Sequence, residues 1–191
     1  MMMPMEKSDS ELAAAYKNGD QRAIEVLVAR HISAVYNFVK RFVNEEHADD
    51  VTQETFVRVW KHIKRYDESR SFKVWLFTIA KRLSIDFTRK RKNIPFSSFE
   101  NENEETFDAE DQSELPHEIF QRKETASALE ALVAKLPDDR RAIVILHDLE
   151  RLSFDEIADI MDRPMNTVKS QYRRAIVSLR DMIRDGGAPK L

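Results

Sequence analysis

The chain has 191 residues, with 31 Lys and Arg, 34 Asp and Glu, no Cys, three Gly and a formal net charge of -3. The absence of cysteine excludes a disulfide framework, a thiolate metal site and a cysteine nucleophile. No segment approaches the roughly 18 to 20 apolar residues that cross a bilayer, so we expect a cytoplasmic protein without membrane insertion. Phosphate-binding loops and tight hairpins usually require glycine, and this chain has only three. We therefore predict an almost entirely helical protein.

The charge is unevenly distributed along the chain. Residues 93–116 contain eight acidic residues and no Lys or Arg, so the remainder carries 31 basic against 26 acidic residues, a charge of +5. This acidic segment has no sustained apolar period and cannot build a core of its own. We therefore predict two small basic domains, residues 1–92 and 117–191, joined by a flexible acidic linker over residues 93–116.

Four helices are predicted in the first domain. Ser8 with Glu11 forms a capping box for a helix that ends near Gly19, and Asp20 caps a long amphipathic second helix. A third helix spans about 48–63, with Trp60 among the apolar residues at helical spacing. The fourth runs from about 72 to 92 and ends in a basic cluster, which is typical of either a solvated helix end or a nucleic-acid surface.

The second domain contains a helix-turn-helix pattern over residues 152–176. Ser153 with Glu156 predicts a second capping box, Pro164 ends the first helix, and Asn166 is expected to adopt a left-handed conformation or to cap the next helix. Ahead of this pattern, Asp138 is expected to cap another helix. Val168 and Ala175 should seat the last helix on the core, and its outward residues are predicted to be Lys169, Gln171, Arg173 and Arg174.

Such a helix pair is also a common packing unit, but these outward side chains are of the types that reach phosphates and base edges in a major groove. Catalysis is not expected. Adjacent carboxylates such as Asp49 and Asp50 point about 100° apart on a helix, and the five His form no metal-binding set. We expect no metal and no cofactor.

Four blocks in order along the chain resemble the sigma-70 family of bacterial RNA polymerase initiation factors, in its small two-domain extracytoplasmic-function (ECF) type. These blocks are Tyr16 to Asp20 with Ala23, Ala48 to Trp60, Phe72 to Ala80 with Asp86 and Arg89, and Leu152 to Ala175. The chain departs from the family pattern at Arg82, Asn166, Gln171 and Tyr172. Gln171 in place of a common Arg favours adenine over guanine.

The resemblance implies a role for each surface. It implies that the third helix binds the clamp helices of the polymerase β′ subunit through Asp49, Asp50, Gln53, Glu54, Arg58 and Trp60. It implies that minus-10 DNA is captured and melted by Tyr66, Asp67, Glu68, Ser69, Arg70, Ser71, Lys73, Arg82, Arg89 and Arg91. It implies that the minus-35 element is read by Thr167, Lys169, Ser170, Gln171, Arg173 and Arg174, while the second domain binds the β flap.

The expected protein is therefore an all-α, non-catalytic sigma factor that is monomeric when free, confers promoter specificity and nucleates melting. The resemblance also implies an anti-sigma partner that controls a stress or envelope regulon. An alternative is a helix-turn-helix regulator that binds duplex DNA without polymerase, with a sensor or dimerisation unit at its N-terminus. An enzyme is a third alternative, but it lacks an assembled nucleophile, metal set or phosphate loop.

Overall fold

A computed structural model describes residues 7–92 and 128–185 of the chain. Within these residues every regular element is helical, as the composition predicts, and no helix is long and apolar enough to cross a bilayer. The predicted acidic linker, residues 93–116, lies outside the described residues.

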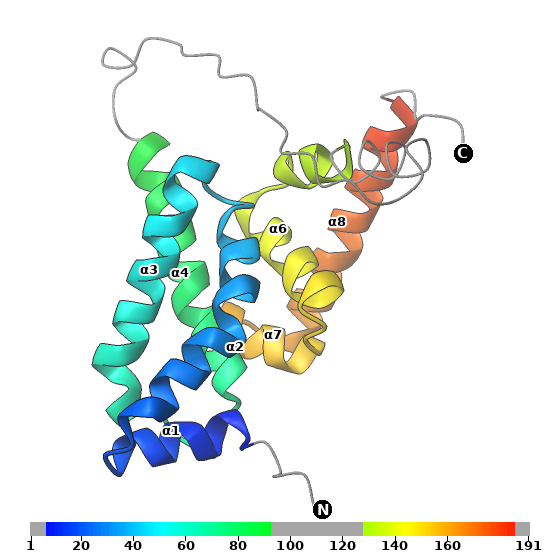
Figure 1. Cartoon of the computed structure of the whole chain (residues 1–191). Coiled ribbons are helices and arrows are strands. Elements are labelled where there is room, and N and C mark those ends of the chain that lie inside the picture. Colours follow the sequence, from blue (N-terminus) through cyan, green and yellow to red (C-terminus); the bar gives the residue numbers. More distant parts are fainter. Residues whose placement is uncertain (1–6, 93–127, 186–191) are drawn as a thin grey trace, which may run out of the picture.

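The first unit is a bundle of three long helices with a short helix across one end (Figure 1). Its elements are α1 (Asp9–Lys17), α2 (Gln21–Val39), α3 (Glu45–His62), the 3-10 turn η1 (Ile63–Arg65) and α4 (Phe72–Lys92). The phenyl rings of Phe38 in α2 and Phe77 in α4 meet edge to face at 5.5 Å, and both side chains are fully buried. Aromatic packing therefore holds the centre of this bundle.

Local sequence signals define the start of the bundle as predicted. The Ser8 hydroxyl accepts a hydrogen bond from Glu11 N at 3.3 Å, and the Glu11 carboxylate accepts one from Ser8 N at 2.7 Å. The Asp20 carboxylate caps α2 by accepting from Arg22 N at 3.1 Å. These caps satisfy backbone N–H groups that have no partner within the helix.

The second unit begins with a helix over residues 128–134. It continues through α6 (Asp138–Val144), the π-helical segment η3 (Ile145–Leu149), α7 (Phe154–Met161) and α8 (Met165–Asp185). The apolar spacing does not indicate the π-helical segment, because its five residues are too few to reveal a change in the spacing.

Two predicted caps in this unit are wrong. Asp138 is the first residue of α6, and the preceding Pro137 occupies the cap position without a side-chain hydrogen bond. The left-handed residue of the helix-turn-helix is Asp162, with φ 53°, whereas Asn166 lies in the first turn of α8. Asp can adopt this conformation as Asn can, so the turn forms four residues earlier than predicted.

The two units pack against each other. α7 lies beside α4 (Figure 1), and Arg141 of α6 contacts Arg41 and Phe42, which follow α2. One continuous cluster of buried apolar side chains includes Phe38 and Phe77 of the first unit together with Ile143 and Ile157 of the second. A smaller cluster, made of Leu136, Val144, Ala175 and Leu179, belongs to the second unit alone. The described residues therefore share their main core.

Candidate nucleic-acid interface

The segment 67–71 between η1 and α4 forms a compact exposed turn. Ser69 donates to the Asp67 carboxylate through its backbone N at 3.0 Å and its hydroxyl at 2.7 Å. The hydrogen bonds from the hydroxyl and then from the backbone N–H of Ser69 lower the pKa of the Asp67 carboxyl. The turn is thus held in one conformation while Glu68, Ser69 and Arg70 remain exposed to solvent.

Tyr66 forms the inner wall of this turn. Its ring is 4% exposed and packs at 5.1 Å from Trp75 and at 5.5 Å from Phe72, and its hydroxyl donates to Arg70 O. Phe72 is likewise buried, and Trp75 is partly buried. These rings pack with the core, and they support the turn from beneath.

The turn is also tied to the N-terminal helix. Lys17 Nζ of α1 donates to Tyr66 O at 2.6 Å and forms an ion pair with Glu68 at 2.8 Å. On the basic helix α4, Arg82 and Arg89 are exposed, and Lys73 is partly buried. The side chain of Arg91 lies outside the described part of the chain. A preformed loop with cationic side chains beside it is suited to hold a polyanionic strand.

The outer face of α3 combines carboxylates with an exposed indole. Asp49, Asp50, Gln53 and Glu54 are all exposed, and Glu54 accepts a hydrogen bond from Arg58 Nε at 2.8 Å. This hydrogen bond lowers the pKa of the Glu54 carboxyl. Trp60 is 55% exposed, so it does not share the buried face of the other apolar residues at helical spacing on this helix.

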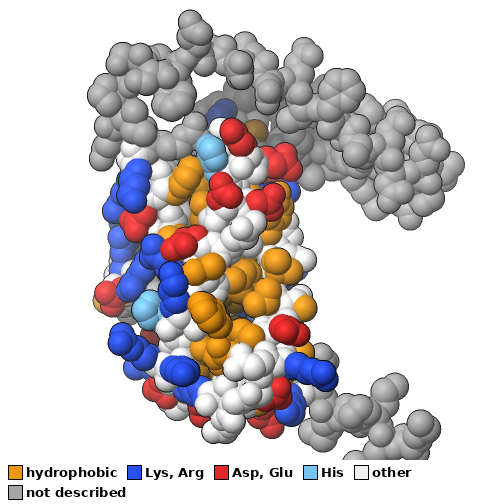
Figure 2. Space-filling model, turned by 60° about the vertical axis from the view of Figure 1, so that its left-hand side comes forward, with side chains coloured by type: hydrophobic (Ala, Val, Ile, Leu, Met, Phe, Trp, Pro, Cys, Tyr) orange, Lys and Arg blue, Asp and Glu red, His pale blue; other side chains and the backbone are white. Residues whose placement is uncertain are grey.

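Apolar side chains gather along the middle of the face that carries α3, with acidic groups above them and basic groups to the left (Figure 2). The large exposed apolar residues of these helices include Val57 and Trp60 of α3 and Ile32 of α2. Desolvation raises the pKa of the Tyr36 phenol in α2, and the negative charges of Asp49 and Glu45 raise it further. An apolar strip edged by acids is typical of a surface that binds a basic, amphipathic partner.

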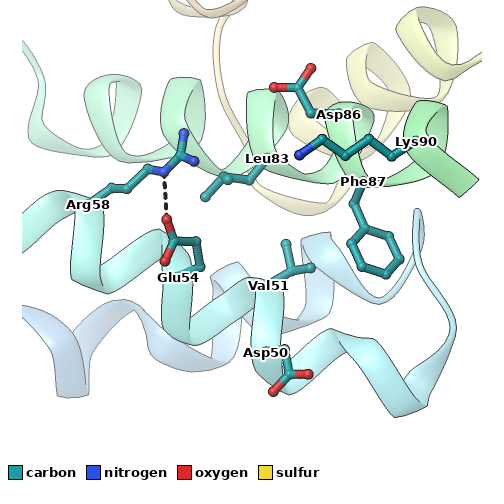
Figure 3. A pocket seen from close by; sticks show the side chains of 8 residues that line it. All are labelled: Asp50, Val51, Glu54, Arg58, Leu83, Asp86, Phe87 and Lys90. Atoms are coloured by element: carbon teal, nitrogen blue, oxygen red, sulfur yellow. Dashed lines mark hydrogen bonds and ion pairs between the residues drawn. The ribbon is translucent and has the colours of Figure 1, made fainter.

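A groove of about 360 Å³ runs between α3 and α4 (Figure 3). Val51 and Glu54 of α3 point toward Leu83 and Phe87 of α4 across an apolar floor, while Asp50 and Asp86 lie at its outer edges. The groove extends the acidic face of α3 toward the basic end of α4.

The helix-turn-helix is formed by α7 and α8. Ser153 and Glu156 make the predicted capping box, with Glu156 N donating to the Ser153 hydroxyl at 3.3 Å. Val168 and Ala175 are fully buried, as predicted, and fix which side of α8 faces the core. Lys169, Ser170, Arg173 and Arg174 are consequently exposed, and Thr167 is partly buried.

Gln171 is the exception among the predicted outward residues. It is partly buried, and its Oε1 atom is buried without a hydrogen-bond partner. The prediction that Gln171 projects fully outward is therefore wrong. It lies beside the buried stripe of α8, three residues after Val168 and four before Ala175, so it shares the edge of that face.

Tyr172 and its neighbours form a cluster that the sequence reasoning missed. The Tyr172 ring lies edge-on to His147 at 4.9 Å and to Phe154 at 5.4 Å, and His147 stacks on Phe154 at 4.2 Å. His147 Nδ1 is also 3.0 Å from Leu152 O. These contacts join η3, α7 and α8. The aromatic residues themselves were the available signal, but their separation in sequence hides the contact.

No group of three or more His, Asp or Glu able to hold a metal ion occurs within residues 7–92 and 128–185.

Comparison with known proteins agrees with this arrangement. The Sigma-70 region 2 family matches residues 27–94, and the Sigma-70 region 4 family matches residues 126–179. The ECF RNA polymerase sigma factor SigW of Bacillus subtilis is 32% identical over 88% of this chain and 93% of its own length. The ECF sigma-E factor of Escherichia coli K12 is 30% identical over 91% of this chain and 93% of its own length.

Solved structures with the same fold include two protein complexes. CnrH in complex with the cytosolic domain of CnrY is 27% identical, with a TM-score of 0.72 over 95% of this chain and 100% of that chain. The sigma factor RpoE in complex with the anti-sigma factor NepR from Bartonella quintana has a TM-score of 0.67 at 20% identity, over 84% of this chain and 96% of that one. The chain described here belongs to the sigma-70 family, in its ECF group, and is a factor for promoter-specific transcription initiation.

Proposed function

We propose that the acidic and apolar face of α3 binds the β′ clamp helices of core RNA polymerase. The exposed carboxylates of Asp49, Asp50 and Glu54 suit a basic partner, and the exposed Trp60 offers a large apolar anchor. Gln53 and Arg58 complete the surface. The amphipathic character of this face supports a helix-on-helix contact, with Trp60 near the C-terminal end of α3 and the carboxylates toward its N-terminal end.

The turn 67–71 and α4 form the proposed minus-10 site. The turn exposes hydrogen-bonding groups of Glu68, Ser69 and Arg70 around a buried Tyr66, an arrangement suited to hold an unstacked base. Arg82 and Arg89 of α4, together with Lys73, supply positive charge for the phosphates. The proposed site also includes Ser71, at the end of the turn, and Arg91, whose side chain lies outside the described part of the chain.

The exposed side of α8 forms the proposed minus-35 site. Lys169, Arg173 and Arg174 reach base edges and phosphates in the major groove, while Ser170 and Thr167 lie near the N-terminal end, where phosphate contacts are favoured. Gln171 reads adenine in this proposal, after a side-chain rotation that exposes Oε1. Elsewhere in the second unit, exposed Leu149 and Val177 are suited to an apolar contact with the β flap.

The chain would act in the cytoplasm as a monomeric, non-catalytic adaptor whose chemistry is supplied by the polymerase. Its residues 93–116 would follow the path of nascent RNA, since they carry eight acidic charges. Two of the structural relatives are bound to CnrY or to the anti-sigma factor NepR. By analogy we propose control by an anti-sigma factor in this chain as well.

The coexistence of the exposed Trp60 face with the preformed turn 67–71 carries the proposal, since a regulator acting alone needs neither a polymerase surface nor a base-capturing turn. The decisive experiment is in vitro transcription with core polymerase, with and without the chain. New promoter-dependent transcripts are expected only when both are present. Duplex binding without any new initiation would instead favour the helix-turn-helix regulator.

A further inference from the structure

Lys17, at the C-terminal end of α1, is joined to the chain around the turn 67–71. Its Nζ atom donates to Tyr66 O at 2.6 Å and lies 2.8 Å from Glu68 Oε1. The same atom lies 5.7 Å from the centre of the Tyr66 ring. Lys17 and Tyr66 are 49 residues apart in the sequence, so a side chain of the first helix helps to form the base of the turn.

The surroundings of Lys17 distinguish it from an ordinary surface lysine. A lysine in the last turn of a helix usually stays in water, where it complements the helix dipole, and an exposed ion pair contributes little. The Lys17 side chain is only 23% exposed. An ammonium group that is partly removed from water needs acceptors for its three N–H groups. The Tyr66 carbonyl and the Glu68 carboxylate are two such acceptors, so one cation holds both.

The helix α1 presents Lys17 from a fixed position. Near the start of this helix, the Asp9 carboxylate accepts a hydrogen bond from Arg30 Nη1 at 2.6 Å and lies 2.7 Å from His31 Nε2, both in α2. The His31 ring in turn lies 5.6 Å from the ring of Phe72, the first residue of α4. Because α1 is fixed at both ends, Lys17 has a rigid support, as a precisely placed binding group requires.

The ion pair with α1 places the one side chain that the internal bonds of the turn leave out. Those bonds join Ser69 to the Asp67 carboxylate and the Tyr66 hydroxyl to Arg70 O, and none of them includes Glu68. The Glu68 side chain is 44% exposed, so it can still meet a ligand. Its carboxylate is therefore accessible from solvent while the ammonium group of α1 fixes where it lies.

A carboxylate placed at a DNA site has two effects. An unpaired carboxylate repels phosphates, whereas an ammonium group 2.8 Å away largely compensates its charge at the distance of a neighbouring phosphate. A carboxylate can only accept hydrogen bonds, and the amino groups of cytosine and adenine donate them. Thymine presents a carbonyl oxygen in the same place, where it would face the carboxylate. A carboxylate in a fixed position therefore discriminates against thymine.

We propose that Lys17 is a positioning residue of the minus-10 site, and that it holds the Glu68 carboxylate so that the turn selects an unstacked cytosine or adenine over thymine. The inference rests on the proposed function, because it takes the turn 67–71 as the element that captures a base. Lys17 does not contact DNA in this arrangement and acts through Glu68. It adds α1 to the site, a helix to which the sequence reasoning gave no role in DNA binding.

The test measures base selection by the holoenzyme. The full chain is combined with core polymerase and mixed with a randomised pool of single-stranded oligodeoxynucleotides, and the bound fraction is sequenced. The readout is the ratio of cytosine and adenine to thymine at each position of the shared motif. Lys17→Met keeps the length of the side chain and removes its charge. Lys40→Met is the matched control, at an exposed lysine outside the proposed sites.

One motif position should favour cytosine or adenine over thymine by about fivefold or more with the unchanged chain. Lys17→Met and Glu68→Gln are each expected to lower that ratio by about threefold, and Lys40→Met to leave it unchanged. Partial unfolding would reduce the amount bound for every sequence alike and would not move the ratio. A motif in which every position tolerates thymine, or a ratio that Lys17→Met leaves unchanged, would overturn the inference.

Two further variants test whether Lys17 acts through Glu68. Lys17→Arg keeps the charge and the donors, so it should restore the ratio to near that of the unchanged chain. The double variant Lys17→Met/Glu68→Gln should lose no more selectivity than Glu68→Gln alone, since coupled residues are not additive. A further loss in the double variant would contradict the positioning role.

The proposed function is tested separately by the unchanged chain in the same reaction. If its holoenzyme enriches no sequence and starts no transcript, the proposed function fails and the inference with it. If that holoenzyme selects a motif and initiates transcription while the ratio is insensitive to Lys17 and Glu68, only the inference fails.

Discussion

The phenol of Tyr172 in α8 donates a hydrogen bond to the Asp148 carboxylate in η3 at 2.9 Å. This bond ties the helix proposed to enter the major groove to the π-helical segment that precedes the helix-turn-helix. Desolvation, followed by the hydrogen bond to Asp148, raises the pKa of Tyr172 to about 12. The orientation of α8 therefore depends on a polar contact as well as on its buried stripe.

Tyr172→Phe should keep the aromatic contacts and lose only this hydrogen bond. We expect the free energy of unfolding to fall by about 1 kcal/mol, the usual net value of one hydrogen bond. Urea denaturation at neutral pH, followed by circular dichroism, measures the change. An unchanged midpoint would show that the Tyr172–Asp148 contact contributes nothing to stability.

The same variant has a defined pH dependence. Because folding raises the Tyr172 pKa from 10.0 to about 12, the folded state favours the protonated phenol. The stabilisation is fully present below pH 10 and is lost as pH rises toward 12. The difference in unfolding free energy between wild type and Tyr172→Phe should therefore shrink over that interval. A difference that stays constant would contradict the assigned shift.

Arg174→Ala should weaken binding to promoter DNA. Arg174 is exposed on the outer side of α8, and loss of a base contact costs about 1 to 3 kcal/mol. The matched control is Arg180→Ala, which removes the same charge from an exposed position further along α8. Run-off transcription and holoenzyme footprinting should separate the two variants. Equal losses of promoter binding in the two variants would show that Arg174 contributes only its positive charge and no base contact.

Trp60→Ala should weaken polymerase binding while leaving the fold intact. Since more than half of the side chain is exposed, we expect the unfolding free energy to change by no more than about 0.5 kcal/mol. A buried tryptophan anchor at an interface contributes about 2 kcal/mol, or about thirtyfold in Kd. Val26→Ala on α2 is the control, because it truncates another exposed apolar side chain. Equal core-binding titrations for the two variants would exclude Trp60 as an anchor.

Asp67→Asn should alter promoter opening. The change removes the negative charge from the group that accepts two hydrogen bonds from Ser69, and so weakens one restraint on the turn. Permanganate footprints of the melted region are expected to weaken or to shift in sequence preference. Asp181→Asn on α8 makes the same chemical change outside the proposed sites and serves as the control. Identical footprints for the two variants would show that the turn has no role in promoter melting.

The sequence by itself determined the local features of this protein and its family. The capping boxes at Ser8 and Ser153 are confirmed because each depends on two residues three positions apart. The buried stripe through Val168 and Ala175 is confirmed because helical geometry alone places those residues on one face. The four ordered blocks indicated the sigma-70 family because each block is also a local pattern, made of residues close together in the sequence.

The tertiary structure decided which of several similar residues face a partner. Trp60 and Trp75 both recur at helical spacing, yet Trp60 is exposed and Trp75 packs on Tyr66, because the neighbouring helices cover one and leave the other open. Lys73 and Lys81 are ordinary basic residues in the sequence. Their partners are main-chain carbonyls almost eighty residues away, and a carbonyl leaves no signature in the side-chain pattern. Only the packing of α7 against α4 brings these groups together.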